Sequence, residues 1–298
     1  MFLNIRRARP VYAAVGVAAL AIVLAACGEK KNDNPGGTQP SSTVDQALAA
    51  KVPDAIKSDG KIKIGTDSTY APNEFEDNGK IVGFDVDLFN AVAAKLGLQT
   101  EWIKSGFGDI IPGVTQSGKY ELGVSSFTIN PERKAQSLMI SYFNAGTQWA
   151  AKTGNPSGVK VDDACGKKIA VQKDTVQVAD VTARSKKCTD ASKPAIVIDQ
   201  FPGQDTATNA VVTGKDDAML ADSPVGAYAV KQSAGQLETV GDVYDAAPYG
   251  YVVGKDQQQF AEAIRDAVKA LIVDGSYQKI LQNWGVQGGA ITDPAINP

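Results

Sequence analysis

Strand-like and helix-like segments alternate along most of this chain, and this alternation limits the possible folds more than any other feature. A first series has strands at 61–66, 80–84, 99–104 and 120–124, with helices at 85–97 and 107–117 between them, the first capped by Asp85. A strand signal over 147–152 follows. A second series has strands at 168–172, 195–198 and 217–221, with helices at about 176–185, at 204–213 and from Pro224. A strand at 249–253 and two amphipathic helices follow, the first with Phe260, Ile264, Val268 and Leu271 on one face. Two such series predict two α/β lobes, each with a largely parallel twisted sheet.

The composition excludes several classes of function. With 298 residues the chain is long enough for two lobes. It contains no histidine, which excludes histidine-dependent triads, zinc sites and imidazole acid–base chemistry, and no metal or cofactor is expected. Residues 27–298 carry 27 basic and 33 acidic side chains, a net charge of −6, which argues against nucleic acid as the main partner.

The first 27 residues have the pattern of a bacterial lipoprotein signal. Three arginines precede an apolar run of sixteen residues from Val11 to Ala26, and a spanning helix needs about 20, so residues 1–26 are predicted to be a cleavable signal peptide. The run ends in Leu-Ala-Ala-Cys, which matches the lipobox, although a secreted protein with an incidental cysteine is the alternative. We expect Cys27 to carry acyl chains such as palmitate, to anchor the chain to the outer face of the cell membrane, and to begin a flexible tether over 27–43.

The two remaining cysteines, Cys165 and Cys188, bracket one strand–helix unit of the second series. In an oxidising compartment such a pair is predicted to form a structural disulfide. The bridge is expected to hold the end of the helix beside the start of the strand.

Several segments, in this order, resemble the polar amino-acid-binding proteins of ABC importers, the family-3 solute-binding proteins. The matching runs are Ile64–Pro72, Val82–Leu88, Phe107–Gly113, Ser125–Arg133, Ile169–Gln177, Met219–Asp222 and Asp274–Tyr277. The resemblance implies a two-lobed periplasmic-binding-protein-like fold of type II, in which each lobe has a mixed, mainly parallel sheet flanked by helices and two crossing segments form the hinge. It further implies that lobe one comprises 44–148 plus 247–298 and that lobe two comprises 149–246.

The resemblance also implies a site for a free L-amino acid between the lobes. A buried zwitterion needs paired charges, and Arg133 and Asp222 fall at the family's carboxylate-binding and ammonium-binding positions. Ser126 is expected to help Asp222, and Thr128 and Thr175 to add donors for the carboxylate. The predicted ligand-binding residues are Asp67, Tyr70, Phe107, Ser125, Ser126, Thr128, Arg133, Thr175 and Asp222.

Some of these positions have plainer explanations. The stretch from Ser125 to Arg133 follows a buried strand and leads into a helix, which is where open α/β sheets bind small ligands, but it also suits a hydroxyl-rich turn before a surface arginine. Tyr70 and Phe107 match the family's aromatic walls, and aromatic residues at element ends are commonly core. Asp67 is placed either to meet a polar or cationic ligand side chain or to cap its own loop as an Asx turn.

Three further positions bear on the ligand. Glu74 is a weaker candidate for contacting the ligand side chain. Asn73 stands where an aromatic residue is common in the family, which is expected to open or polarise that wall. Asp174 stands where the family often has glycine; we expect its side chain to face solvent, and a position in the cleft would favour a cationic ligand.

The sequence thus predicts a monomeric, lipid-anchored receptor that hands an amino acid to an ABC permease without catalysing a reaction. The expected ligand is arginine, lysine, ornithine or glutamine. One alternative is a sensor domain that reports amino-acid status to a membrane partner. The other is an enzyme on the same scaffold, resembling cyclohexadienyl dehydratases, which would need a buried carboxylate with a raised pKa.

Overall fold

The computed structural model describes residues 43–298. The predicted signal peptide, the predicted lipidation site Cys27 and almost all of the predicted tether lie outside the described residues. No helix within 43–298 is long and apolar enough to cross a membrane.

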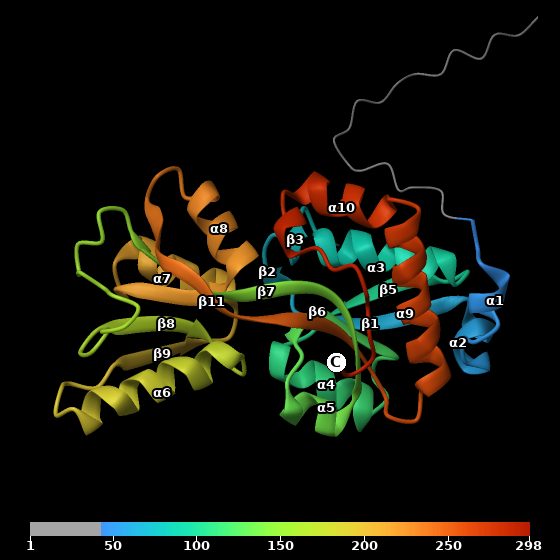
Figure 1. Cartoon of the computed structure of the whole chain (residues 1–298), viewed down its shortest axis with the longest axis horizontal. Coiled ribbons are helices and arrows are strands. Elements are labelled where there is room, and N and C mark those ends of the chain that lie inside the picture. Colours follow the sequence, from blue (N-terminus) through green and yellow to red (C-terminus); the bar gives the residue numbers. More distant parts are fainter. Residues whose placement is uncertain (1–42) are drawn as a thin grey trace, which may run out of the picture. The chain divides into compact units, whose positions relative to one another are not determined.

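Within residues 43–298 a mixed sheet of eight strands runs through two lobes (Figure 1). At one end β1 pairs in parallel with β5 and β6, and at the other end β8 pairs in parallel with β9 and β10. Between them β7 and β11 run antiparallel to each other and cross from one lobe to the other, which makes the expected two-segment hinge. The strand order is β5 (Gln99–Lys104), β1 (Lys61–Thr66), β6 (Leu122–Thr128), β11 (Leu237–Val253), β7 (Leu138–Lys152), β10 (Ala218–Asp222), β8 (Lys168–Gln172) and β9 (Val197–Phe201).

A second, three-stranded sheet lies at the edge of the first lobe and brings residues to the cleft between the lobes. It consists of β2 (Thr69–Tyr70), β3 (Glu74–Asp77) and β4 (Lys80–Val82). The helices of the first lobe are α1 (Gln46–Ala49), α2 (Asp54–Asp59), α3 (Phe84–Lys95), α4 (Phe107–Thr115), α5 (Pro131–Gln136), α9 (Gln258–Val273) and α10 (Ser276–Trp284), with the 3₁₀ turn η1 (Gln287–Gly289). The helices of the second lobe are α6 (Val176–Asp190), α7 (Gln204–Thr213) and α8 (Ser223–Gln232).

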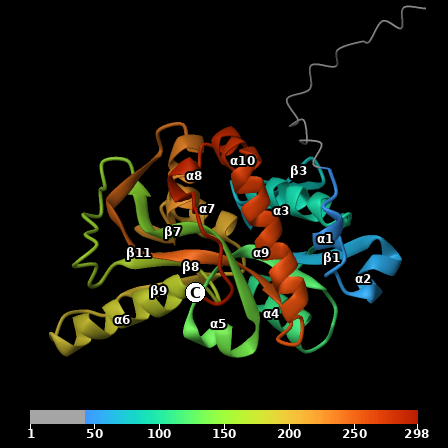
Figure 2. The same ribbon diagram turned by 45° about the vertical axis from the view of Figure 1, so that its right-hand side comes forward.

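The hydrophobic core is divided between the lobes. In the first lobe, α3, α9 and α10 pack on one another and on the sheet, so the end of the chain returns to the lobe that contains its beginning (Figure 2). The predicted apolar face of α9 is fully buried there. The second lobe has its own clusters, one centred on Trp149 and Val181 and one on Ala207 and Met219. The two-lobed, helix-flanked architecture is confirmed, and the residue boundaries of the lobes stay a prediction.

One local prediction was wrong. Asp85 does not cap α3; the N-cap is Gly83, the helix begins at Phe84, and the preceding strand ends at Val82. Gly83 has φ 140°, and an added Cβ would lie 2.0 Å from the carbonyl oxygen of Asn73, so only glycine fits this entry. Asp85 is thereby carried one residue into the helix, where its side chain is buried.

The predicted disulfide between Cys165 and Cys188 is present, with 5.5 Å between the two Cα atoms. Cys188 lies in the last turn of α6, and Cys165 lies shortly before β8. The bridge therefore ties the end of this helix to the segment that enters the neighbouring strand, as expected.

Candidate ligand-binding site

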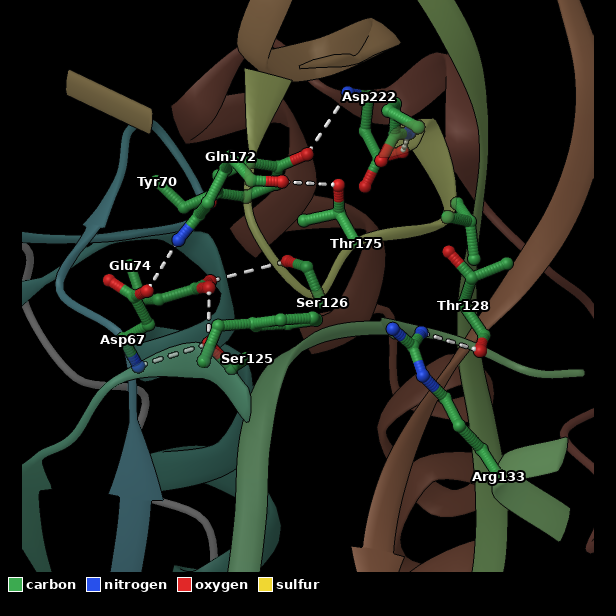
Figure 3. Close-up of a pocket in the computed structure, with 13 residues that line it drawn as sticks. Asp67, Tyr70, Glu74, Ser125, Ser126, Thr128, Arg133, Gln172, Thr175 and Asp222 are labelled. Carbon is green, nitrogen blue, oxygen red and sulfur yellow. Dashed lines mark hydrogen bonds between the residues drawn. The ribbon is translucent and has the colours of Figure 1, made fainter. Parts of the chain in front are cut away.

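A pocket lies between the two lobes, and both contribute to its lining. All nine predicted ligand-binding residues line it, together with Glu74, Gln172, Val176 and Gln177. Asp67 and Glu74 lie toward one end of the pocket and Arg133 toward the other (Figure 3). The structure therefore brings together residues spread over 156 positions of sequence, and their roles toward a ligand stay predictions.

Arg133 extends from the short helix α5, whose N-cap Asn130 accepts a hydrogen bond from the Arg133 backbone N–H at 2.9 Å. Its guanidinium lies over the rings of Phe107 and Phe127, 5.2 and 5.5 Å from their centroids. The side chain donates to the carbonyl of Thr128 at 2.9 Å, and more weakly to that of Asp174 at 3.5 Å. Burial lowers the pKa of the guanidinium, and the charge of Asp222 opposes that shift.

Arg133 is only 9% exposed, yet no salt bridge to it is found within residues 43–298. Two carbonyl groups and two rings compensate its charge only in part, because neither carries a full negative charge. A carboxylate that enters the pocket would meet a guanidinium suited to bidentate hydrogen bonding.

Asp222 is the last residue of β10 and comes from the second lobe. Its carboxylate accepts hydrogen bonds from Gln177 Nε2 and from the Tyr249 hydroxyl, each at 2.7 Å. Its backbone N–H donates to the Tyr70 hydroxyl at 3.0 Å. Burial raises the pKa of Asp222, while these hydrogen bonds and the charge of Arg133 oppose the rise.

Asp67 forms the Asx turn that its position allowed, and its contact with a ligand side chain stays a prediction. It accepts hydrogen bonds from the backbone N–H and hydroxyl of Thr69, at 3.1 and 2.8 Å, which is the predicted Asx turn. Its other oxygen accepts a hydrogen bond of 2.5 Å from Gln172 Nε2 of the second lobe. Burial raises the pKa of Asp67, and the hydrogen bonds from Thr69 and Gln172 oppose the rise.

Ser125 and Ser126 connect the pocket to a buried polar cluster. Ser125 Oγ donates to Glu74 Oε1 at 2.9 Å. Ser126 Oγ accepts a hydrogen bond of 2.7 Å from Asn73 Nδ2, and the residue has φ 50°. Asn73 is fully buried and lies outside the pocket lining, so the expectation that it opens or polarises the wall was wrong. Its amide instead positions Ser126 from behind.

Thr128 lies at the end of a strand, and Thr175 lies between β8 and α6, where the predicted strand and helix place it. Thr128 is the last residue of β6 and pairs with Tyr249, so it lies in the strand and not at the mouth of a helix, which begins at Pro131. Thr175 is the N-cap residue of α6, and its hydroxyl donates to the carbonyl of Gln172 at 2.7 Å.

Tyr70 and Phe107 are both pocket walls and core residues. Tyr70 packs against Ala221 and Val225 of the second lobe, and Phe107 stacks on Phe127 with 4.8 Å between ring centroids. Both side chains are buried and line the pocket, and their contact with a ligand stays a prediction.

The lobes also contact each other directly, so the structure is closed. Besides the contacts of Asp67 and Tyr70, the Gln204 backbone N–H donates to Thr69 Oγ1 at 3.1 Å. Asp174 is exposed and has φ 65°, a conformation that suits glycine, which accounts for the glycine expected there.

Sequence reasoning missed Gln172, Val176 and Gln177. A signal was available for the first, because Gln172 ends a parallel strand, and side chains at the carboxyl ends of such strands face the ligand crevice. Nothing local distinguishes Gln177, whose partner Asp222 lies 45 residues away.

Comparison with known proteins agrees with this geometry. The family model described as bacterial extracellular solute-binding proteins, family 3, matches residues 62–287. The arginine-binding protein ArgT of Corynebacterium glutamicum is 36% identical over 293 residues, covering 97% of this chain and 96% of that protein. An ancestral arginine-binding protein bound to arginine has a TM-score of 0.69 at 35% identity, and the same kind of protein bound to glutamine has 0.68 at 35%; each match covers 76% of this chain and 98% of the other. All three are named as binding proteins.

Proposed function

Because the chain belongs to the bacterial extracellular solute-binding proteins of family 3, we propose that it captures a free amino acid between its lobes and delivers it to an ABC transporter permease. Acyl chains on Cys27 would hold the receptor at the outer face of the cell membrane, and the tether that follows would let it reach the permease. The receptor works as a monomer in this proposal.

The observation that carries the proposal is the buried, unpaired charge of Arg133 in a pocket that also contains Asp222. An α-carboxylate on the guanidinium and an α-ammonium on Asp222 would supply each buried charge with a partner of opposite sign. Because Arg133 belongs to the first lobe and Asp222 to the second, one zwitterion would join the lobes and favour the closed state.

The other end of the pocket supports a polar or basic ligand. Asp67 and Glu74 are both acidic and lie away from Arg133 (Figure 3). Arginine, lysine, ornithine or glutamine would present a cation or an amide to them. The similarity to ArgT and to an arginine-bound structure supports arginine first.

A thermal-shift panel of the twenty common amino acids and ornithine on the purified protein tests this function. A ligand that binds only the folded state at 100 times its Kd stabilises the protein by about 2.7 kcal/mol, so the ligand should stand out clearly. D-arginine is a matched control, because its carboxylate and ammonium exchange places relative to the side chain. If no amino acid raises the melting temperature, the proposed function is wrong.

A further inference from the structure

Two buried carboxyl groups, Glu74 of β3 and Asp85 of α3, lie next to each other at the acidic end of the pocket. Neither side chain is exposed. Ser126 Oγ lies 3.2 Å from Glu74 Oε2 and 3.2 Å from Asp85 Oδ2, so the two carboxyl groups share one hydroxyl. Glu74 lines the pocket and Asp85 does not, so only Glu74 can touch a ligand.

The available hydrogen-bond donors do not suffice for two negative charges. Ser126 has one hydroxyl proton for two carboxylates. Asp85 Oδ2 also accepts from the Ser126 backbone N–H at 3.1 Å and from the Tyr142 hydroxyl at 2.7 Å. Asp85 Oδ1, however, is buried without a hydrogen-bond partner among residues 43–298. A proton between Glu74 and Asp85 supplies the missing donor.

The groups around the pair also favour one retained proton. Those that face it are Asp67 from the segment between β1 and β2, Tyr70 of β2, Tyr142 of β7 and Tyr251 of β11. Each is an acid or a phenol. No lysine or arginine in the described part of the chain forms a salt bridge with either carboxyl group. Burial and the neighbouring carboxylate raise the pKa of Glu74 well above its usual range, and burial raises that of Asp85 to about 6.

We propose that Glu74 and Asp85 share one proton in the empty pocket and exchange it for the side-chain cation of a basic amino acid. This inference rests on the proposed function and names its substrate class. The step transfers no other group: the Glu74 carboxyl proton leaves to water, and the carboxylate left behind pairs with the guanidinium or ammonium of the ligand. A neutral side chain such as that of glutamine leaves the proton in place.

The sign of the resulting pH dependence follows from linkage. The bound cation lowers the pKa of Glu74, so the proton is lost on binding at any pH between the pKa of the bound state and that of the empty state. In that range a rise in pH favours binding, by up to tenfold per pH unit for one proton. Below the bound-state pKa the proton stays, and above the empty-state pKa none is left to release.

Isothermal titration calorimetry on the full-length protein counts the released protons directly. Arginine, lysine, ornithine and glutamine are titrated at pH 6, 7 and 8 in phosphate and in Tris, whose ionisation enthalpies differ. We expect a basic amino acid to release up to one proton more than glutamine at one or more of these pH values. Glutamine is the matched ligand, because its α-ammonium and α-carboxylate cause the same changes at Asp222 and Arg133.

Two variants test whether the proton released on binding comes from the pair Glu74 and Asp85. Glu74→Gln keeps the size of the side chain and an acceptor for Ser125, and it should abolish the additional proton release and weaken the basic ligand at least tenfold. The melting temperature of the ligand-free variant, compared with that of the unsubstituted protein, shows whether the variant is folded. Glu76→Gln, an exposed acid on the same strand, should leave the proton count unchanged.

The outcomes separate this inference from the proposed function. A basic amino acid that binds with the same proton count as glutamine overturns the inference and leaves the function intact. If only neutral amino acids bind, the inference is also overturned and the proposed function is again left intact. If no amino acid binds, the proposed function itself fails.

Discussion

Arg133 is held by groups that orient its charge without neutralising it. The two aromatic rings contribute about 1–2 kcal/mol each at a desolvated site, and the two carbonyl oxygens fix the direction of the guanidinium. The side chain is therefore pre-organised before a ligand arrives, and little rotamer entropy is lost on binding.

Replacing Arg133 with alanine should lower the affinity for the amino acid at least tens-fold. The loss of a buried charge partner costs about 2–5 kcal/mol, since the ligand carboxylate would remain buried without a cation. Calorimetric titration measures the change in Kd. Arg184→Ala is the matched control, because Arg184 also stacks on two aromatic rings but does not line the pocket. A fall of less than threefold for Arg133→Ala would mean that the carboxylate is bound elsewhere.

At the residue scale, the sequence predicted the members of the site better than their contacts. The nine predicted ligand-binding residues, Arg133 and Asp222 among them, all line the pocket. Asp85 was mistaken for a helix cap because aspartate is common at that position, and its partner Tyr142 is 57 residues away. Asn73 was misplaced for the same reason: the Ser126 hydroxyl that it contacts is distant in sequence.

At the element scale, several short segments were predicted closely, β6 and β9 start two residues later than predicted, and the two longest strands were mostly missed. The bounds of β1, β5, β8 and α7 coincide with the predictions, because hydrophobic period and turn residues define them locally. For β7 and β11 only the ends, 147–152 and 249–253, were recognised. Their middle parts are held by pairing with each other across about 100 residues of sequence, and no local pattern reports such pairing.

Replacing both Cys165 and Cys188 with serine should destabilise the protein without changing ligand affinity. The bridge closes a loop between residues 23 positions apart, and the chain-entropy estimate for a loop of this size is about 3 kcal/mol. Denaturant unfolding measures the loss, and titration measures the affinity. The affinity should hold because Cys188 is at the far end of α6 from Thr175, which lines the pocket. A tenfold loss of affinity would show that the bridge positions the pocket end of the helix.

At the scale of the whole molecule, closure depends on a few polar contacts between the lobes. Gln172 contacts Asp67, the backbone of Asp222 contacts Tyr70, and the backbone of Gln204 contacts Thr69. Thr69, unlike Asp67 and Tyr70, does not line the pocket. It therefore reports on closure separately from direct ligand contact.

Thr69→Val should weaken ligand binding roughly two- to tenfold without changing which amino acids bind, because one hydrogen bond contributes about 0.5–1.5 kcal/mol. The Thr69 hydroxyl accepts a hydrogen bond from the Gln204 backbone N–H and donates one to Asp67. Valine can form neither bond, so the closed state is less stable in the variant. Small-angle X-ray scattering should show a larger radius of gyration at subsaturating ligand. Thr69→Ser keeps the hydroxyl, so its ligand affinity and its radius of gyration should equal those of the unsubstituted protein. Unchanged affinity in Thr69→Val would exclude this contact from closure.

The pairing of β7 with β11 has a consequence for how such proteins diversify. Ala247 lies opposite Ala145, and Tyr244 lies opposite Thr147, so the chain enters and leaves the second lobe at neighbouring points. The two points at which the chain crosses between the lobes are thus adjacent. Recombination at these two points would exchange the second lobe as a single unit. Such an exchange would replace Gln172, Thr175, Gln177 and Asp222 together and leave Arg133, Asp67 and Glu74 in the recipient. Half a pocket can therefore be inherited independently of the other half.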